Sequence, residues 1–313
     1  MMLRNSTYAG VLAASVSVLV PGIAFGAEGA SSHYLPGTAG DLGFALPPAA
    51  GFQFANILWS QSGAAQKAVV QGNVNLDLDV NVTLDILALT YTLANPVWGA
   101  TYTFGASLPF GSASLDADIL GPNGGRFGAS QSSFALSDAA ITPIQLNWAT
   151  GRWAFELSQA VIVASGEYDV DDKVNLGRNY TSFDTAGAVT WLDPATALEV
   201  SVAAGLMINT ENNDTDYRTG NEFHMDFAVN HMVLPTFSYG VRGYYYDQVS
   251  ADSGEGATLG DFKSSALGLG AGFVWLPAAA SSKLSIAGRY MTDIEATNRF
   301  ESDYAQLLVG WKF

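Results

Sequence analysis

The chain ends in the stretch Tyr304–Phe313, YAQLLVGWKF. Read alternately, it has two different faces. One face carries Ala305, Leu307, Val309, Trp311 and Phe313. Gln306 and Lys312 lie on the other face. Strict alternation is typical of a β-strand between two environments. An aromatic residue at the end of such a strand, where chains commonly fray, predicts that the last strand is held by pairing to its end.

The composition favours a transmembrane β-barrel. Charged residues make up 13% of the 313 residues, and hydrophobic residues make up 49%, with a mean hydropathy of +0.18. The charged fraction is about half of that in an average soluble domain. Outside the N-terminus, however, no apolar run reaches the roughly 18 residues of a spanning helix. A barrel reconciles these facts, because only every second residue of its strands faces lipid.

Charge and motif content exclude several other classes. The net charge is −16, which argues against binding nucleic acid. There is no cysteine, so thiol chemistry and cysteine-based metal sites are excluded. Neither G-x-S-x-G nor H-E-x-x-H occurs. We therefore predict no catalytic residue, no metal and no cofactor, and we expect that the protein is not an enzyme.

The N-terminus divides into two predicted segments before the barrel. Residues 1–27 have one positive charge at Arg4, then an apolar stretch and small residues, which is the layout of a secretory signal peptide. Residues 28–50 show no alternation, and Pro36 and Pro47 keep them irregular. This segment is predicted to be either a plug inside the lumen or a periplasmic lead-in. Residues 51–313 are predicted to form the barrel.

Twelve antiparallel strands are predicted in an up-and-down order. They cover 52–60, 76–92, 97–109, 133–148, 152–164, 181–192, 196–209, 219–233, 236–248, 262–276, 282–294 and 300–313. Short connections alternate with mostly longer ones at 61–73, 110–131, 165–180, 210–218 and 249–261, as expected for periplasmic turns and extracellular loops. We expect the apolar rows to face lipid and the polar rows to line water.

Two sets of residues are predicted to have defined places. Aromatic residues near the short turns and the C-terminus are expected to form the membrane girdle: Trp98, Trp148, Trp153, Trp191, Trp275, Trp311 and Phe313. Polar residues on the inner rows of the later strands are expected to line the lumen and the substrate path: Glu222, His224, Asp226, Arg242, Tyr244, Tyr246, Gln248, Arg289 and Lys312. The second set fits a network that stiffens the lumen or a constriction that selects substrates.

Several stretches resemble a known family. They are EGASSHYLPGTAGDLGFALPPAAGF, NTENNDTDYRTGNEFHMDFAV, GYYYDQVSADSGEGATLGDFKSSALGLGAGF and the final GWKF. Together they resemble the outer-membrane transporter family labelled "putative meta-pathway of phenol degradation", which is grouped with the functional-amyloid export channels. The resemblance implies an exported twelve-stranded barrel that passes small hydrophobic or aromatic compounds.

We therefore expect a channel of the bacterial outer membrane that works by passive diffusion. The alternatives are a secretion channel of the amyloid-export type and, with less support, an outer-membrane lipase or a structural barrel. The expected partners are the lipid bilayer, a small hydrophobic solute, the outer-membrane assembly machinery that binds the strand ending in Phe313, and further copies of the chain in a homo-oligomer.

Overall fold

A computed structural model describes residues 32–70, 73–120, 126–257, 263–277 and 283–313. The predicted signal peptide lies outside the described residues. Thirteen strands are present: β1 Gly51–Val70, β2 Asn73–Thr92, β3 Thr101–Leu120, β4 Arg126–Leu136, β5 Ala139–Thr150, β6 Trp153–Val163, β7 Ser182–Asp193, β8 Leu198–Asn209, β9 Glu222–Leu234, β10 Phe237–Gln248, β11 Ser265–Trp275, β12 Leu284–Thr297 and β13 Glu301–Lys312. Among these residues, no helix is long and apolar enough to cross a membrane.

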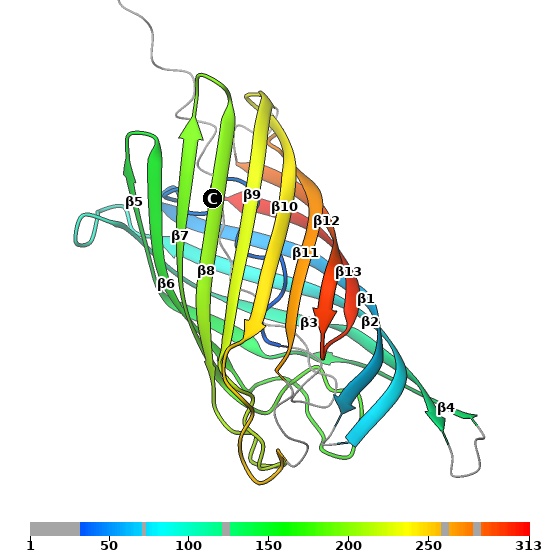
Figure 1. The fold of residues 1–313 in the computed structure, drawn as a ribbon. Helices are drawn as coiled ribbons and strands as arrows, with labels where there is room; N and C mark the ends of the chain where they lie inside the picture. Colours follow the sequence, from blue (N-terminus) through cyan, green and yellow to red (C-terminus); the bar gives the residue numbers. More distant parts are fainter. Residues whose placement is uncertain (1–31, 71–72, 121–125, 258–262, 278–282) are drawn as a thin grey trace, which may run out of the picture.

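Twelve of the strands close into an antiparallel barrel, and β4 is an additional strand attached to β3 (Figure 1). The ring is completed where the last strand meets the first, with Trp311 opposite Phe54 and Leu307 opposite Leu58. Closure leaves neither strand with an unpaired edge. The predicted fold class is confirmed, and the C-terminal alternation has its explanation: Tyr304 and Gln306 are buried inside, while Leu307 and Val309 are exposed outside.

Two predicted loops are instead the ends of long hairpins. Residues 61–70 continue β1, and residues 110–120 continue β3, so that β1, β2 and β3 each have 20 residues. β3 pairs with β5 near Thr101–Ser107 but with β4 from Phe110 onward. The β3–β4 hairpin therefore projects from the barrel (Figure 1). Backbone pairing holds these extensions, whereas their Gly, Ser and Asn content made them look like loops.

The predicted strand 133–148 is two strands. Ser137 and Asp138 separate β4 from β5, and both side chains are fully buried. Pro143 lies within β5, where the pairing with β6 shifts register between Ile141 and Ile144. A register shift accommodates proline because the residue has no N–H to contribute to the ladder.

The expectation that apolar rows face lipid is wrong for part of β2. Leu78, Val80, Val82, Leu84 and Ile86 point inward and are at most 2% exposed. The opposite row, from Asp79 to Asp85, lies on the outer surface. From Leu87 onward the outer row becomes apolar, with Leu89 49% exposed. A carboxylate facing lipid is unfavourable, so we infer that β2 leaves the membrane near Leu87 and that its outer half is surrounded by water.

The predicted girdle residues all lie on the outside of the barrel, near the end with the short turns. Trp98 is 81% exposed, Trp153 48%, Trp275 45%, Trp311 39% and Phe313 66%. Trp148 and Trp191 are half-buried on the same surface. Trp59, which is not among them, points into the barrel and is 2% exposed.

Candidate transport path inside the barrel

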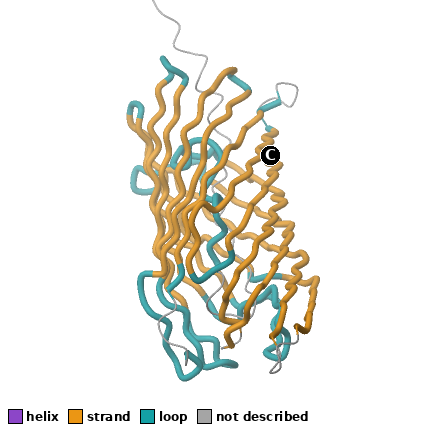
Figure 2. The backbone as a smooth tube through the Cα atoms, turned by 45° about the vertical axis from the view of Figure 1, so that its right-hand side comes forward, coloured by secondary structure: helices purple, strands orange, loops and turns teal. Residues whose placement is uncertain are grey.

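Residues 32–46 lie inside the barrel and contact strands around its circumference. The backbone N–H of Gly37 donates to Asp226 Oδ1 on β9 over 2.7 Å. Nearer the short turns, the N–H groups of Phe44 and Ala45 donate to Ser201 Oγ on β8 and Thr190 Oγ1 on β7, over 3.1 and 3.0 Å. Figure 2 shows this segment as a loop running within the barrel. We call residues 32–46 the plug. Of the two arrangements open from the sequence, the structure has the lumenal one.

The outer end of the plug is held at Asp138. His33 Nε2 lies 3.1 Å from Asp138 Oδ2, and both side chains are fully buried. The same carboxylate accepts the N–H groups of Ser165, Gly166 and Arg178 from the loop 164–181, at 2.7 to 2.9 Å. Arg178 Nη2 in turn donates to the Ser32 carbonyl over 2.7 Å. One buried acid therefore joins the plug, the outer loop and the β4–β5 junction.

His33 is neutral near pH 7. Burial lowers its pKa from 6.5 to about 4, although the hydrogen bond to Asp138 acts in the opposite direction. Burial would raise the pKa of Asp138, but the bonds from His33 and from backbone N–H groups outweigh it and lower that pKa. The contact is thus a hydrogen bond from a neutral imidazole to a carboxylate, and an ion pair forms only if His33 is protonated.

The polar residues predicted for the lumen are gathered on its inner surface. All but one are at most 7% exposed, namely Glu222, His224, Asp226, Arg242, Tyr244, Tyr246, Gln248 and Arg289. Lys312 lies at the rim and is half-buried. His224 Nε2 is 3.0 Å from Asp184 Oδ1, and Tyr246 Oη donates to Glu222 Oε1 over 2.6 Å. Whether a substrate passes along these residues stays a prediction.

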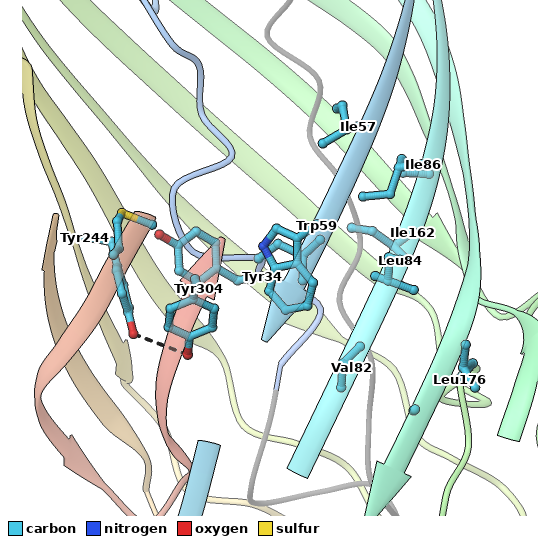
Figure 3. Close-up of a cluster of buried hydrophobic side chains, with 14 of the residues drawn as sticks. Tyr34, Ile57, Trp59, Val82, Leu84, Ile86, Ile162, Leu176, Tyr244 and Tyr304 are labelled. Carbon is cyan, nitrogen blue, oxygen red and sulfur yellow. Dashed lines mark hydrogen bonds between the residues drawn. The ribbon is translucent and has the colours of Figure 1, made fainter. Parts of the chain in front are cut away.

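Aromatic rings form a continuous group across the middle of the lumen. Tyr34 of the plug stacks on His224, with ring centroids 4.6 Å apart, and lies parallel to Tyr246 at 6.1 Å. Tyr304 lies 5.8 Å from both Tyr244 and Trp59 (Figure 3). Stacked and edge-to-face rings attract each other beyond their burial. The plug ring therefore fills a slot that is shaped for a flat aromatic group.

Beside this group, on the side of the lumen formed by β1 and β2, the wall is apolar. The inward row of β2 meets Ile57, Ile162 and Met207 from the wall, and Val174 and Leu176 from the loop 164–181 (Figure 3). Leu35 of the plug belongs to the same cluster. A hydrated ion would have to lose its water to enter such a region, at high cost. This side of the path is therefore suited to apolar groups, whereas buried polar side chains such as Arg178, Asn209 and Glu222 lie toward the long loops.

Glycines on the inner row of β11 make room for the large polar side chains. A Cβ at Gly268 would lie 2.3 Å from the Tyr244 ring, and a Cβ at Gly272 would lie 2.4 Å from Arg242 Nε. Distances below 3.0 Å require something to shift. The run SALGLGAGFVW thus alternates between lipid-facing apolar residues and inward glycines that neighbouring strands cover.

Sequence reasoning missed several lumen residues. The missed residues are Trp59, Asp41 and Arg299. The guanidinium of Arg299 lies 4.6 Å from the centre of the Tyr246 ring. Tyr304 shares the inner row of the last strand with Gln306, which alternation had already placed on the polar face. Asp41 carried no such signal, because it lies in the irregular segment. Among the described residues, no group of three or more His, Cys, Asp or Glu could hold a metal ion.

A closed antiparallel barrel with an apolar outer belt and a polar, plugged lumen defines an outer-membrane β-barrel protein. Its place is the bacterial outer membrane. A family model described as "Putative MetA-pathway of phenol degradation" matches residues 62–309, and the chain belongs to this family.

A solved structure of an outer membrane channel shows the same fold. The COG4313 outer membrane channel from Pseudomonas putida F1 is 16% identical, with a TM-score of 0.69, and the match covers 85% of this chain and 96% of that one. The NanC porin is 9% identical, with a TM-score of 0.42 over 82% of this chain and 100% of that one. No curated protein matches the chain in sequence.

Proposed function

We propose that this protein is an outer-membrane channel through which small hydrophobic or aromatic compounds diffuse passively. The observation that carries the proposal is the lining of the lumen. The side formed by β2 is apolar from Leu78 to Ile86, and stacked rings surround Tyr34 beside it. These two surfaces suit a molecule with an aromatic body and few polar groups. The solved structures of similar fold are a channel and a porin by name, which is consistent with this role.

The conformation described here is closed. Tyr34, Leu35 and Phe44 of the plug are each at most 5% exposed, which means that they fill the space a solute would use. Passage therefore requires the plug to move, at least in part. Hydrogen bonds and side-chain packing hold the plug, and no covalent bond is involved, so thermal opening needs no energy source.

The experiment is a permeation assay in vesicles whose outer leaflet is lipopolysaccharide, which resists direct partitioning of the solute. Vesicles with and without the purified protein are exposed to benzyl alcohol or to raffinose. We expect the protein to accelerate entry of benzyl alcohol and to leave raffinose entry unchanged. Faster entry of the sugar, or no acceleration of the aromatic solute, would contradict the proposal.

A secretion channel of the amyloid-export type is the second candidate, and the plug is the observation that favours it. The apolar cluster that lines the β1 and β2 side of the lumen argues against it, because a polypeptide carries polar backbone groups past every position. Addition of an unfolded polypeptide to the protein in a planar bilayer distinguishes the two. Transient blockades that depend on polypeptide length would favour secretion.

A further inference from the structure

Two arginines of the lumen wall point to the same residue of the plug. Arg289 Nη2 on β12 donates to Asp41 Oδ1 over 2.5 Å. Arg242 Nη2 on β10 donates to the Asp41 backbone carbonyl. The two strands are separated by β11, where Gly272 lies opposite Arg289 and has no side chain to block Arg242. The missing side chain on β11 is what lets both guanidinium groups reach one point of the lumen.

The arginines have more hydrogen-bonding capacity than the plug uses. Arg242 and Arg289 are 2% and 7% exposed. The Nε and Nη1 atoms of both are buried and find no hydrogen-bond partner among the described residues. A guanidinium group binds a carboxylate best through two parallel N–H bonds. Asp41 instead gives one carboxylate oxygen to Arg289 and only its backbone carbonyl to Arg242.

Nearby carboxylates do not accept these unused N–H groups, because they already accept hydrogen bonds from other donors. Asp226 Oδ1 accepts the N–H of Gly37 over 2.7 Å. Glu199 accepts Asn230 Nδ2 over 2.5 Å and the hydroxyl of Ser201. Asn230 also donates to the Asp41 carbonyl over 3.3 Å and accepts from Arg242. The guanidinium groups of Arg242 and Arg289 thus form a site for a carboxylate. Asp41 of the plug uses only part of the hydrogen-bonding capacity of this site.

The geometry points to a carboxylate-binding site at Arg242 and Arg289, occupied by Asp41 in the closed barrel and by a small aromatic carboxylate during passage. The aromatic slot around Tyr34 on the same wall supplies the second part of the ligand's chemistry. Arginine is suited to this task because it stays charged when buried and presents a planar fork. This inference rests on the proposed function and names the substrate class of that same path.

The test is equilibrium binding of benzoate and of benzyl alcohol to the purified full-length protein in nanodiscs. Asp41→Asn keeps the shape of the side chain and removes the tethered competitor. We expect this variant to bind benzoate about tenfold more tightly, because a tethered group competes at a high effective concentration. Its affinity for benzyl alcohol should stay unchanged. Asp171→Asn, which removes a carboxylate from an exposed part of the loop 164–181, is the matched control and should bind like the wild type.

A second pair of variants tests the arginine directly. In the Asp41→Asn background, Arg289→Gln should abolish the gain for benzoate, whereas Arg289→Lys should retain part of it because the charge remains. Heat-dependent migration on gels checks that each variant is folded. An equal gain in affinity for both solutes, or a gain for benzoate that survives Arg289→Gln, would refute the carboxylate site. Asp41 would then serve only to hold the plug in place.

Binding and permeation are measured separately, so the two proposals fail in different ways. If benzoate binds as expected but no aromatic solute crosses, the channel function is refuted and the carboxylate site stands. If benzyl alcohol crosses but the affinity for benzoate does not change with these substitutions, only the carboxylate site is refuted.

Discussion

At the scale of single residues, His33 is the titratable group that connects the plug to the barrel near neutral pH. Its neutral side chain is enclosed with Asp138, Arg178, Ser182 and Tyr180. Burial gives it a pKa of about 4, below the 6.5 of an exposed imidazole. A group whose pKa falls on docking favours the docked state only while it is neutral. Docking is therefore fully stable above pH 6.5 and is weakened as the pH falls toward 4.

This predicts that acid opens the channel. The full pKa difference corresponds to about 3 kcal/mol of docking free energy as an upper bound. Mean conductance in planar bilayers should rise as the pH falls from 6.5 to 4. His33→Gln keeps a donor and an acceptor but cannot titrate in this range, so its rise should be smaller. Identical pH profiles for wild type and variant would show that His33 does not control docking.

A second residue-scale prediction concerns Gly272. Gly272→Val should displace Arg242 from the plug and destabilise the folded barrel by about 1–3 kcal/mol, as overpacking does. Ala271→Val, its neighbour on the lipid-facing row, should change stability by less than about 0.5 kcal/mol. Urea unfolding followed by heat-dependent gel migration measures both. Equal effects of the two substitutions would mean that the inner row is not tightly packed.

At the scale of elements, β2 shows what alternation can and cannot predict. The segment VNLDLDVNVTLDI predicts a strand with one apolar and one polar face, and the strand is there. Alternation does not say which face meets lipid, because the pattern reads the same for a membrane barrel and for a water-surrounded one. In the outer half of β2, the apolar face meets other apolar faces inside the barrel.

This reversed orientation predicts opposite effects for adjacent residues. Leu84 is fully buried, and Leu84→Asp should destabilise the barrel by about 3–5 kcal/mol, the cost of an unpaired buried charge. Thr83 is exposed on the polar outer row, and Thr83→Asp should be nearly neutral. The same urea titration measures both. Greater damage from Thr83→Asp would place the outer row in lipid and contradict the inferred membrane boundary.

The position of the plug, in contrast, could not be predicted from local sequence pattern. Its residues carry no periodicity, and its contacts join positions far apart in the chain: Asp41 and Arg289 are separated by 248 residues. Such pairings depend on closure of the whole barrel, and local pattern cannot supply them. By contrast, the inward rows of β9 and β12 follow from alternation alone, which is why Glu222, Asp226 and Arg289 could be placed inside from the sequence.

At the scale of the whole molecule, both the outer surface and the lumen of the barrel have an apolar part and a polar part. Its outer surface is apolar near the short turns and polar on the outer half of β2. Its lumen is polar where Arg242, Arg289 and Asp226 meet the plug and apolar along the inward row of β2. In the proposed function, movement of residues 32–46 controls access between these regions. The proposal therefore requires that this one segment can leave its place.

A reversible lock on the plug tests this claim most directly. The chain has no cysteine, so Ala45→Cys with Thr190→Cys introduces the only thiols, at positions joined by a 3.0 Å hydrogen bond. Oxidation, or a short bis-thiol crosslinker, should stop entry of benzyl alcohol into lipopolysaccharide-coated vesicles, and cleavage of the bridge should restore it. Thr190→Cys alone should not respond. Undiminished entry through the locked barrel would contradict the account.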